Sequence, residues 1–227
     1  MFGSFSQLGF LKKKLIVLYS GVTDFESITG SNIREELDLK KTDLVVLMAS
    51  TIYPLKGQYD LLKAFSVIYK SNKNIHLLFA GRTFQGQVKS ENYFTMMKDY
   101  VINNGLTANI HFLGWRDDIP DLHLNSDIYI SSSYSETMPD SVRDAMKYSK
   151  PVVATNVGGT SELIEDKVTG FLIKPGDIKS IIKYLLILTE DKSLRLKMGK
   201  MGKRVISDKL STKKYVLNFQ RMIYDCF

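Results

Sequence analysis

The 227-residue sequence predicts an α/β fold, a doubly wound, Rossmann-like parallel sheet of about six strands with additional helices at its C-terminal end. Short β-rich apolar runs alternate with longer segments of helical periodicity, which is the order that produces a parallel sheet covered on both faces. The loops that follow the apolar runs are rich in Gly, Ser, Thr and charged residues. From residue 177 onward, the pattern is helical throughout.

The elements follow one another in a regular order. The predicted strands are residues 44–49, 75–80, 110–113, 128–132, 152–155 and 171–173. Between them, apolar residues recur at three- and four-residue spacing in segments 59–69, 93–103, 119–124 and 141–148. The C-terminal helical region is broken at 191–193 and again near 208–211. Ligands of such sheets bind beyond the carboxyl ends of the strands, so we expect the site in loops 50–57, 81–86, 114–118, 133–139 and 156–161.

The chain carries 31 Lys and Arg against 24 Asp and Glu, a formal net charge of +7. This balance indicates anionic partners such as phosphates, acidic lipids or nucleic acid. Nucleic acid is disfavoured because the C-terminal charge is not interleaved with aromatic residues. A solvated helix face is the simplest explanation of that charge. The C-terminal cluster comprises Lys192, Arg195, Lys197, Lys200, Lys203, Arg204, Lys209, Lys213 and Lys214.

The cysteine and histidine residues and the hydropathy of the chain bear on disulfides, metal sites and membrane spans. The single cysteine, Cys226, allows neither an intramolecular disulfide nor a zinc cluster. His76 and His111 alternate with apolar strand residues, which favours a structural role, and no metal site is expected. The longest apolar stretches are too short or interrupted to span a bilayer, and the start lacks the features of a signal peptide. We predict a cytoplasmic protein, with peripheral contact at the inner face of a membrane left open.

The sharpest motif lies between the fourth and fifth predicted strands. Glu136 precedes a helix that opens near Pro139, so the amides around Asp140 and Ser141 face a ligand phosphate or sugar oxygen. Glu136 would reach sugar hydroxyls, and Asp144 would reach a second part of the same ligand. The structural alternatives are a helix cap from Glu136 to Ser141 and a surface ion pair of Asp144 with Arg143 or Lys147.

This arrangement resembles the motif of the group-1, family-four retaining glycosyltransferases of the GT-B fold. Their motif has two Glu residues with seven residues between them, the spacing of Glu136 and Asp144. Lys56 and Gly57 match the family's diphosphate-binding lysine-glycine pair, and Gly158, Gly159 and Glu162 follow in family order. Further matches are 15–22 as the interdomain linker strand, Ala80-Gly81, 112–114, 127–133, 169–171 and 175–177.

The resemblance implies transfer of a hexosyl group from a UDP- or GDP-type nucleotide diphosphate-sugar to a saccharide or lipid-linked acceptor hydroxyl, with retention and without a cofactor or obligatory metal. It implies catalytic roles for Lys56 and Glu136, with the nucleobase near Gly114 and Trp115. The implied donor-binding residues are Thr51, Lys56, Gly57, Arg82, Gly114, Trp115, Glu136, Met138, Pro139, Asp140, Ser141, Asp144, Gly158, Gly159 and Glu162.

Several positions depart from the family pattern. Asp144 stands for the second Glu, Thr51 for the arginine before the diphosphate lysine, Ser20 for the linker Asn and Thr137 for a Gly. Arg82 is a candidate to replace the missing cation. We expect residues 1–22 to be the remnant of an N-terminal half and linker, 23–209 the nucleotide-sugar-binding domain, and 210–227 the crossover helix.

Two other functions stay open on the sequence alone. The first is a non-catalytic nucleotide-sugar-binding subunit that needs a separate N-terminal, acceptor-binding partner; Thr51 and the short N-terminal segment favour it. The second is an unrelated dinucleotide binder. It is disfavoured because loop 50–57 contains one Gly instead of a Gly-x-Gly-x-x-Gly turn.

Overall fold

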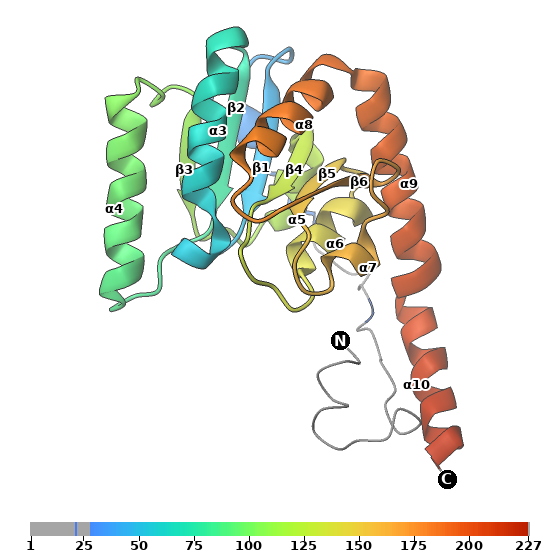
Figure 1. Ribbon diagram of the computed structural model, residues 1–227. Coiled ribbons are helices and arrows are strands. Elements are labelled where there is room, and N and C mark those ends of the chain that lie inside the picture. The colour runs from blue at the N-terminus through green and yellow to red at the C-terminus, as the bar shows by residue number, and fades with distance from the viewer. Residues whose placement is uncertain (1–20, 22–27, 227) are drawn as a thin grey trace.

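The computed structural model describes Gly21 and residues 28–226 of the chain, and these form a six-stranded sheet covered by helices (Figure 1). The predicted linker strand and Ser20 lie outside the described residues, apart from Gly21. The strands are β1 (Leu44–Ala49), β2 (Ile75–Ala80), β3 (Ile110–Gly114), β4 (Ile128–Ser131), β5 (Val152–Thr155) and β6 (Gly170–Ile173).

All strand pairs are parallel, and the order across the sheet is β3-β2-β1-β4-β5-β6. The prediction of a doubly wound sheet of about six strands is therefore confirmed. The chain winds outward from β1 in one direction and from β4 in the other, so the loops at their carboxyl ends diverge. A crevice for ligands forms where the strand order reverses in this way.

The described helical elements include all the predicted ones, and three short elements, at 33–36, 54–56 and 160–163, were not predicted. The described elements are α2 (Ile33–Glu36), the 3₁₀ turn η2 (Pro54–Lys56), α3 (Gln58–Ser71), α4 (Val88–Asn103), α5 (Ile119–Asn125), α6 (Asp140–Lys147), α7 (Thr160–Leu163), α8 (Ile178–Glu190), α9 (Lys192–Leu210) and α10 (Thr212–Cys226). The predicted breaks near 191 and 211 are present. Helix α4 begins before the predicted residue 93, because its first turn is anchored by a buried polar residue: Ser90 Oγ donates to the Ile52 carbonyl at 2.6 Å.

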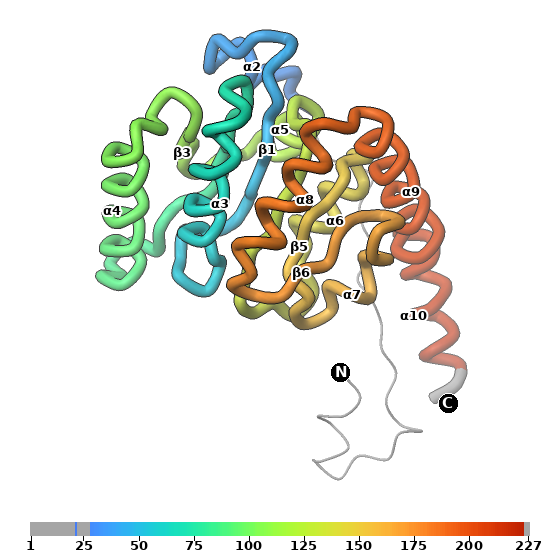
Figure 2. The backbone as a smooth tube through the Cα atoms, turned by 45° about the horizontal axis from the view of Figure 1, so that its top comes forward, coloured from blue at the N-terminus to red at the C-terminus, as the bar shows by residue number. Residues whose placement is uncertain are grey.

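The core has two layers because successive strand residues point to opposite faces of the sheet. Val46 and Met48 of β1 pack with α3, α4 and α8, whereas Val45 and Leu47 pack with the layer that includes α5, α6 and α9. Figure 2 shows α3, α4 and α8 together in front of the sheet. None of the described helices is long and apolar enough to cross a membrane.

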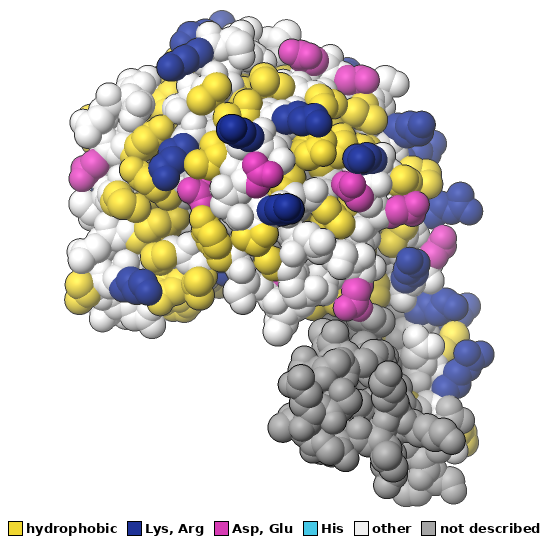
Figure 3. All heavy atoms as spheres, in the orientation of Figure 1, with side chains coloured by type: hydrophobic (Ala, Val, Ile, Leu, Met, Phe, Trp, Pro, Cys, Tyr) yellow, Lys and Arg dark blue, Asp and Glu magenta, His cyan; other side chains and the backbone are white. Residues whose placement is uncertain are grey.

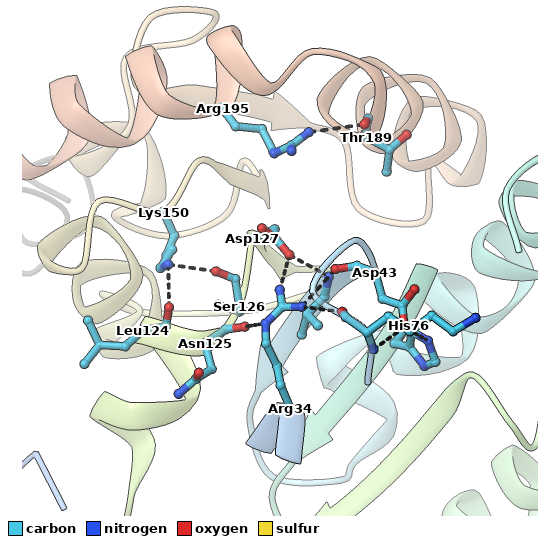
Figure 4. Close-up of polar contacts among 12 residues, drawn as sticks. Arg34, Asp43, His76, Leu124, Asn125, Ser126, Asp127, Lys150, Thr189 and Arg195 are labelled. Atoms are coloured by element: carbon cyan, nitrogen blue, oxygen red, sulfur yellow. Dashed lines mark hydrogen bonds and ion pairs between the residues drawn. The ribbon is translucent and has the colours of Figure 1, made fainter. Parts of the chain in front are cut away.

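A polar network fixes the amino ends of β1 and β4 (Figure 4). Arg34 Nη2 contacts Asp127 Oδ2 at 2.6 Å, and Arg34 Nη1 donates to the Asp43 carbonyl at 2.9 Å. Asp127 Oδ2 also accepts from the Val45 amide. Nearby, the Lys150 ammonium donates to the Ser126 carbonyl at 2.7 Å, and burial lowers the pKa of Lys150. The amino edge of the sheet is thus held by internal hydrogen bonds and an ion pair, whereas the ligand-facing loops follow the carboxyl ends of the strands.

The three histidines are buried or half-buried. His76 Nδ1 and His111 Nε2 are 3.1 Å apart across β2 and β3, and burial lowers the pKa of His111 to about 4. His123 is fully buried between the rings of Tyr129 and Tyr148, and burial lowers its pKa to about 3. Neither ring nitrogen of His123 has a hydrogen-bond partner among the described residues.

We predict that His123 makes the fold sensitive to acid. Its folded-state pKa lies below the ordinary value of 6.5, so its stabilising contribution is present above pH 6.5 and is lost as the pH falls toward 3. At pH 5 the loss is on the order of 2 kcal/mol. The substitution His123→Phe keeps the ring shape and should reduce the loss of stability between pH 7 and pH 5, measured by urea unfolding. An unchanged pH dependence in a folded variant would contradict this account.

Candidate functional site

A pocket of about 580 Å³ opens at the carboxyl edge of the sheet, where the strand order reverses. Its walls come from the loops after β1, β2 and β3 and from the first turn of α6. The predicted donor-binding residues that line it are Thr51, Arg82, Trp115, Asp140, Ser141 and Asp144, together with Ser50, Thr83, Phe84, Arg116 and Asp117. Six of the predicted residues, from four separate segments of the chain, are therefore brought together.

The loops after β1 and β4 touch through their backbones. Gly57 has φ +69°, and a Cβ placed on it would lie 2.1 Å from the Ser132 carbonyl oxygen, so no side chain fits there. Ser132 Oγ donates to the Lys56 carbonyl at 3.1 Å, and the Tyr134 amide donates to the Leu55 carbonyl at 2.7 Å. The loop that carries Lys56 is thereby joined to the loop that carries Glu136.

Lys56 and Glu136 form an ion pair, with 2.8 Å between Nζ and Oε1. The same carboxylate oxygen accepts a hydrogen bond from Ser133 Oγ at 2.7 Å. Their side chains remain 28% and 16% exposed, so both charges are accessible at the surface of the site. Thr155 Oγ1 donates to the Ser133 carbonyl and ties this loop to β5. The structural alternative for Glu136, a helix cap at Ser141, is not what holds it: its described contacts are with Lys56 and Ser133.

Gly158 and Gly159 support the Glu136 loop from behind. Gly158 has φ +53°, and a Cβ on it would lie 2.1 Å from the Glu136 carbonyl oxygen. The Gly159 amide donates to the Thr137 carbonyl at 2.6 Å, and a Cβ there would meet Met138 Cε. The glycine pair therefore permits close backbone packing that shapes residues 136–138.

Helix α6 starts at Asp140, one residue before the predicted segment 141–148. Pro139 is the N-cap, and its carbonyl accepts from the Val142 and Arg143 amides. The amides of Asp140 and Ser141 consequently point out from the helix end toward the pocket. The Asp140 side chain turns back and pairs with Arg143. An anion at this helix end would be favoured by the amides and by the positive end of the helix dipole.

On the far side of the pocket, Arg82 stacks its guanidinium over the Trp115 ring, 4.9 Å from the ring centroid. Trp115 is 63% exposed, and its Nε1 donates to Asp117 Oδ1 at 2.8 Å. Arg116 instead pairs with Glu36 and Asp118, and the hydrogen bond from Arg116 lowers the pKa of Asp118 to about 2. Arg82 is the guanidinium oriented along the pocket wall, while Arg116 anchors the loop.

Nine of the predicted donor-binding residues do not line the pocket: Lys56, Gly57, Gly114, Glu136, Met138, Pro139, Gly158, Gly159 and Glu162. Gly114 bridges β3 to the loop after β2, because its carbonyl accepts from the Gly81 amide at 2.7 Å. Met138 is partly buried against the core. Glu162 lines a different pocket, of about 390 Å³, between α7 and the start of α10, and its role at the donor stays a prediction.

Two contributors to the site carried no motif in the sequence. Tyr129, fully buried in β4, donates its hydroxyl to the Ala49 carbonyl, and the same oxygen is hydrogen-bonded to Ser141. Burial raises the pKa of Tyr129, so the hydroxyl stays protonated. Ser133 fixes Glu136. The available signals were a tyrosine near the start of β4 and a serine in the loop that follows it, but these cannot be distinguished from ordinary core tyrosines and loop serines.

Among the described residues, no group of three His, Cys, Asp or Glu side chains converges as metal ligands would. Within the part of the chain that the structure describes, the charged side chains that line the pocket are those of Arg and Asp, and the Lys56–Glu136 pair lies on the adjoining loops. These are the groups that bind phosphates and sugar hydroxyls.

Comparison with known proteins identifies glycosyltransferases as relatives of this chain. The family model described as glycosyl transferases group 1 matches residues 30–205. The UDP-Gal:alpha-D-GlcNAc-diphosphoundecaprenol alpha-1,3-galactosyltransferase of Escherichia coli is 27% identical over 199 residues, covering 86% of this chain and 50% of that protein. A Campylobacter jejuni N,N'-diacetylbacillosaminyl-diphospho-undecaprenol alpha-1,3-N-acetylgalactosaminyltransferase is 27% identical over 166 residues, 73% of this chain and 40% of that protein.

Solved structures agree with this assignment. Anabaena HepE, crystallised with UDP and glucose, superposes with a TM-score of 0.84 at 25% identity, covering 99% of this chain and 60% of HepE. The C-terminal domain of a Francisella tularensis group 1 glycosyl transferase, LpcC, superposes with a TM-score of 0.71 at 22% identity, covering 86% of this chain and 97% of that domain, and shows the shared fold. The chain spans about half the length of the curated relatives it matches. With three quarters of its residues matched by the family model, the chain belongs to the glycosyl transferases group 1 family.

Proposed function

We propose that this chain is the donor-binding half of a retaining hexosyltransferase of polysaccharide biosynthesis. The observation that carries the proposal is the Lys56–Glu136 ion pair, held by two joined loops beside a pocket that contains Thr51, Arg82 and Asp144. A cation next to a carboxylate suits a ligand that has a diphosphate on one side of a bond and sugar hydroxyls on the other.

In this proposal the diphosphate lies between Lys56 and the amides at the start of α6. The Lys56 ammonium would stabilise the charge that develops on the leaving diphosphate, since preorganised cations and amides act on charge formed in the transition state. Glu136 would accept hydrogen bonds from hexose hydroxyls, with Ser133 holding its carboxylate in place. Asp144 would accept from the ribose, and Trp115 would offer a stacking face to the base.

We propose that Arg82 supplies the second positive charge at the diphosphate, because Thr51 stands where the family has an arginine. The two residues line the same pocket, and the Ile52 amide donates to the Arg82 carbonyl at 3.0 Å, which keeps their loops adjacent. The arginine side chain is long enough to leave the Trp115 ring and reach a phosphate, where a bidentate contact is favourable. A base stacked on Trp115 would take the place of the guanidinium on the ring.

The relatives guide the choice of donor and acceptor. HepE binds UDP and glucose, and the E. coli and C. jejuni relatives are named for transfer to sugars linked to diphosphoundecaprenol. We therefore propose UDP-hexose ahead of a GDP-sugar as donor, and a saccharide or lipid-linked saccharide as acceptor. We propose that acceptor binding needs an N-terminal half like that of the relatives. The anomeric proton coupling of a transfer product would report retention or inversion.

A non-catalytic nucleotide-sugar-binding subunit is the second candidate. Thr51 favours it, because one of the two family diphosphate cations is absent from its position. The two candidates share the donor site and differ in turnover. When the chain is combined with an acceptor-binding half, sugar transfer that Lys56→Ala abolishes would support the transferase, and tight binding without transfer would support the subunit.

We predict that the chain binds uridine diphosphate more tightly than uridine monophosphate, because Lys56 and the α6 amides address the second phosphate. A hydrogen bond to a charged group contributes about 1.5–3 kcal/mol, so the preference should be roughly tenfold to a hundredfold in calorimetric Kd. Lys56→Ala should remove most of this preference. Lys70→Ala, an exposed lysine at the other end of α3, is the matched control. Equal affinity of the wild type for both ligands would remove the diphosphate assignment.

We also predict opposite effects for the two carboxylates. Asp144→Glu adds one carbon-carbon bond, about 1.5 Å of reach, and should tighten UDP binding severalfold. Glu136→Ala should weaken binding of the UDP-sugar while leaving UDP nearly unchanged, because Glu136 is assigned to the hexose. Both variants are measured against both ligands. Weaker binding by Asp144→Glu, or an equal effect of Glu136→Ala on both ligands, would show that these roles are wrong.

A further inference from the structure

Helix α9 presents a strip of positive charge to solvent. Its exposed cations are Lys192, Lys197, Lys200, Lys203, Arg204 and Lys209. At 3.6 residues per turn, the first five of these side chains fall within an arc of about 140° on one side of the helix, and Lys209 lies outside that arc. One exposed carboxylate, Asp208, lies at the border of the arc, 3.6 Å from Arg204. Figure 3 shows the Lys and Arg side chains along the edge of the molecule that α9 and α10 form.

The opposite side of α9 is firmly packed. Met198, Gly199, Gly202, Ile206 and Leu210 are buried, and a Cβ on Gly199 would lie 1.8 Å from the Ser149 carbonyl oxygen. This backbone contact leaves α9 little freedom to roll or shift on the domain. The charged arc is therefore a fixed surface about 28 Å long for a 19-residue helix.

Apolar side chains interrupt the charge. Leu196 is 64% exposed and lies between Lys192, Lys200 and Lys203 on the helix surface, and Met201 is 36% exposed at the border of the arc. A simple solvated helix face gains nothing from an exposed leucine at its centre. A surface that meets the boundary between lipid headgroups and acyl chains does, because Leu196 can enter the apolar layer while the lysines stay with the headgroups.

The chemistry of the cations favours a diffuse anionic surface. Five of the six are lysines, which act as flexible point charges, whereas arginine supplies the bidentate contacts typical of nucleic-acid phosphates. The arc contains no aromatic, Asn or Gln side chain that could read or stack on a base. Lysines spread along a straight, rigid helix match the dispersed charge of an acidic bilayer.

We propose that the exposed face of α9 binds anionic phospholipid membranes peripherally, with its lysines on the headgroups and Leu196 in the interfacial layer. This goes beyond the donor site, which lies at the carboxyl edge of the sheet and shares no residue with the arc. The surface needs no membrane-spanning segment. It would hold the chain at a bilayer through charge and a single apolar anchor.

Vesicle co-flotation with the 227-residue chain tests the proposal. The chain should bind vesicles containing 30% phosphatidylglycerol and leave pure phosphatidylcholine vesicles unbound, and 0.5 M salt should release it. The triple variant Lys197→Glu, Lys200→Glu and Lys203→Glu should weaken binding at least tenfold, since each lysine near an acidic surface contributes about a factor of five. The matched control reverses Lys40, Lys41 and Lys70, which are exposed on other elements.

A second variant reports on the apolar contact. Leu196→Trp should keep binding, and its fluorescence should shift to shorter wavelength on acidic vesicles only. Equal weakening by the α9 and control triples, equal binding to neutral vesicles, or tighter binding to duplex DNA than to vesicles would each overturn the proposal. UDP affinity of the α9 triple should stay at the wild-type value, which confirms folding and separates this surface from the donor site.

Discussion

The approach of Gly57 to the Ser132 carbonyl is the contact on which the site depends. Parallel strands carry their successive loops to one edge of the sheet, but the fold alone does not set the distance between the loops after β1 and β4. Here a left-handed glycine allows the two backbones to meet, and two hydrogen bonds from neighbouring residues hold them together. A lysine and a glutamate from opposite halves of the sheet can then pair at 2.8 Å.

The two edges of the sheet divide structure from function. At the amino edge, Arg34 pairs with Asp127, and the Lys150 ammonium donates hydrogen bonds to the Leu124 and Ser126 carbonyls. At the carboxyl edge, Lys56, Glu136 and the α6 amides stay accessible to a ligand. The two ion pairs are similarly exposed, so the difference lies in the partners of the cation. Arg34 also donates to three backbone carbonyls, whereas the described contact of the Lys56 ammonium is Glu136.

The sequence allowed the strands, the helices and their breaks to be predicted, because apolar periodicity and turn residues are local signals. The motif residues that line the pocket could also be identified. The start of α4 could not, because it rests on Ser90, whose partner at Ile52 is far away in the sequence. Tyr129 and Ser133 were missed for the same reason: their roles arise from contacts with Ala49, Ser141 and Glu136 that no spacing rule encodes. Arg116 and Arg82 are both loop arginines in the sequence. Only their tertiary contacts show that Arg116 anchors its loop to Glu36 and Asp118, whereas Arg82 stacks on Trp115.

The ion pairs of Arg116 affect the conformational entropy of the loop after β3. Its guanidinium joins Glu36 to Asp118, and Ser31 also donates to Asp118, so the loop after β3 is ordered by the segment before β1. Asp121 also accepts hydrogen bonds from the Thr29 and Gly30 amides, which strengthens the connection to the segment before β1. The loop has therefore already lost its conformational freedom when the chain folds, and a ligand that settles on it does not have to restrict that motion again. Recognition at this wall of the pocket then depends on complementarity of shape more than on induced ordering.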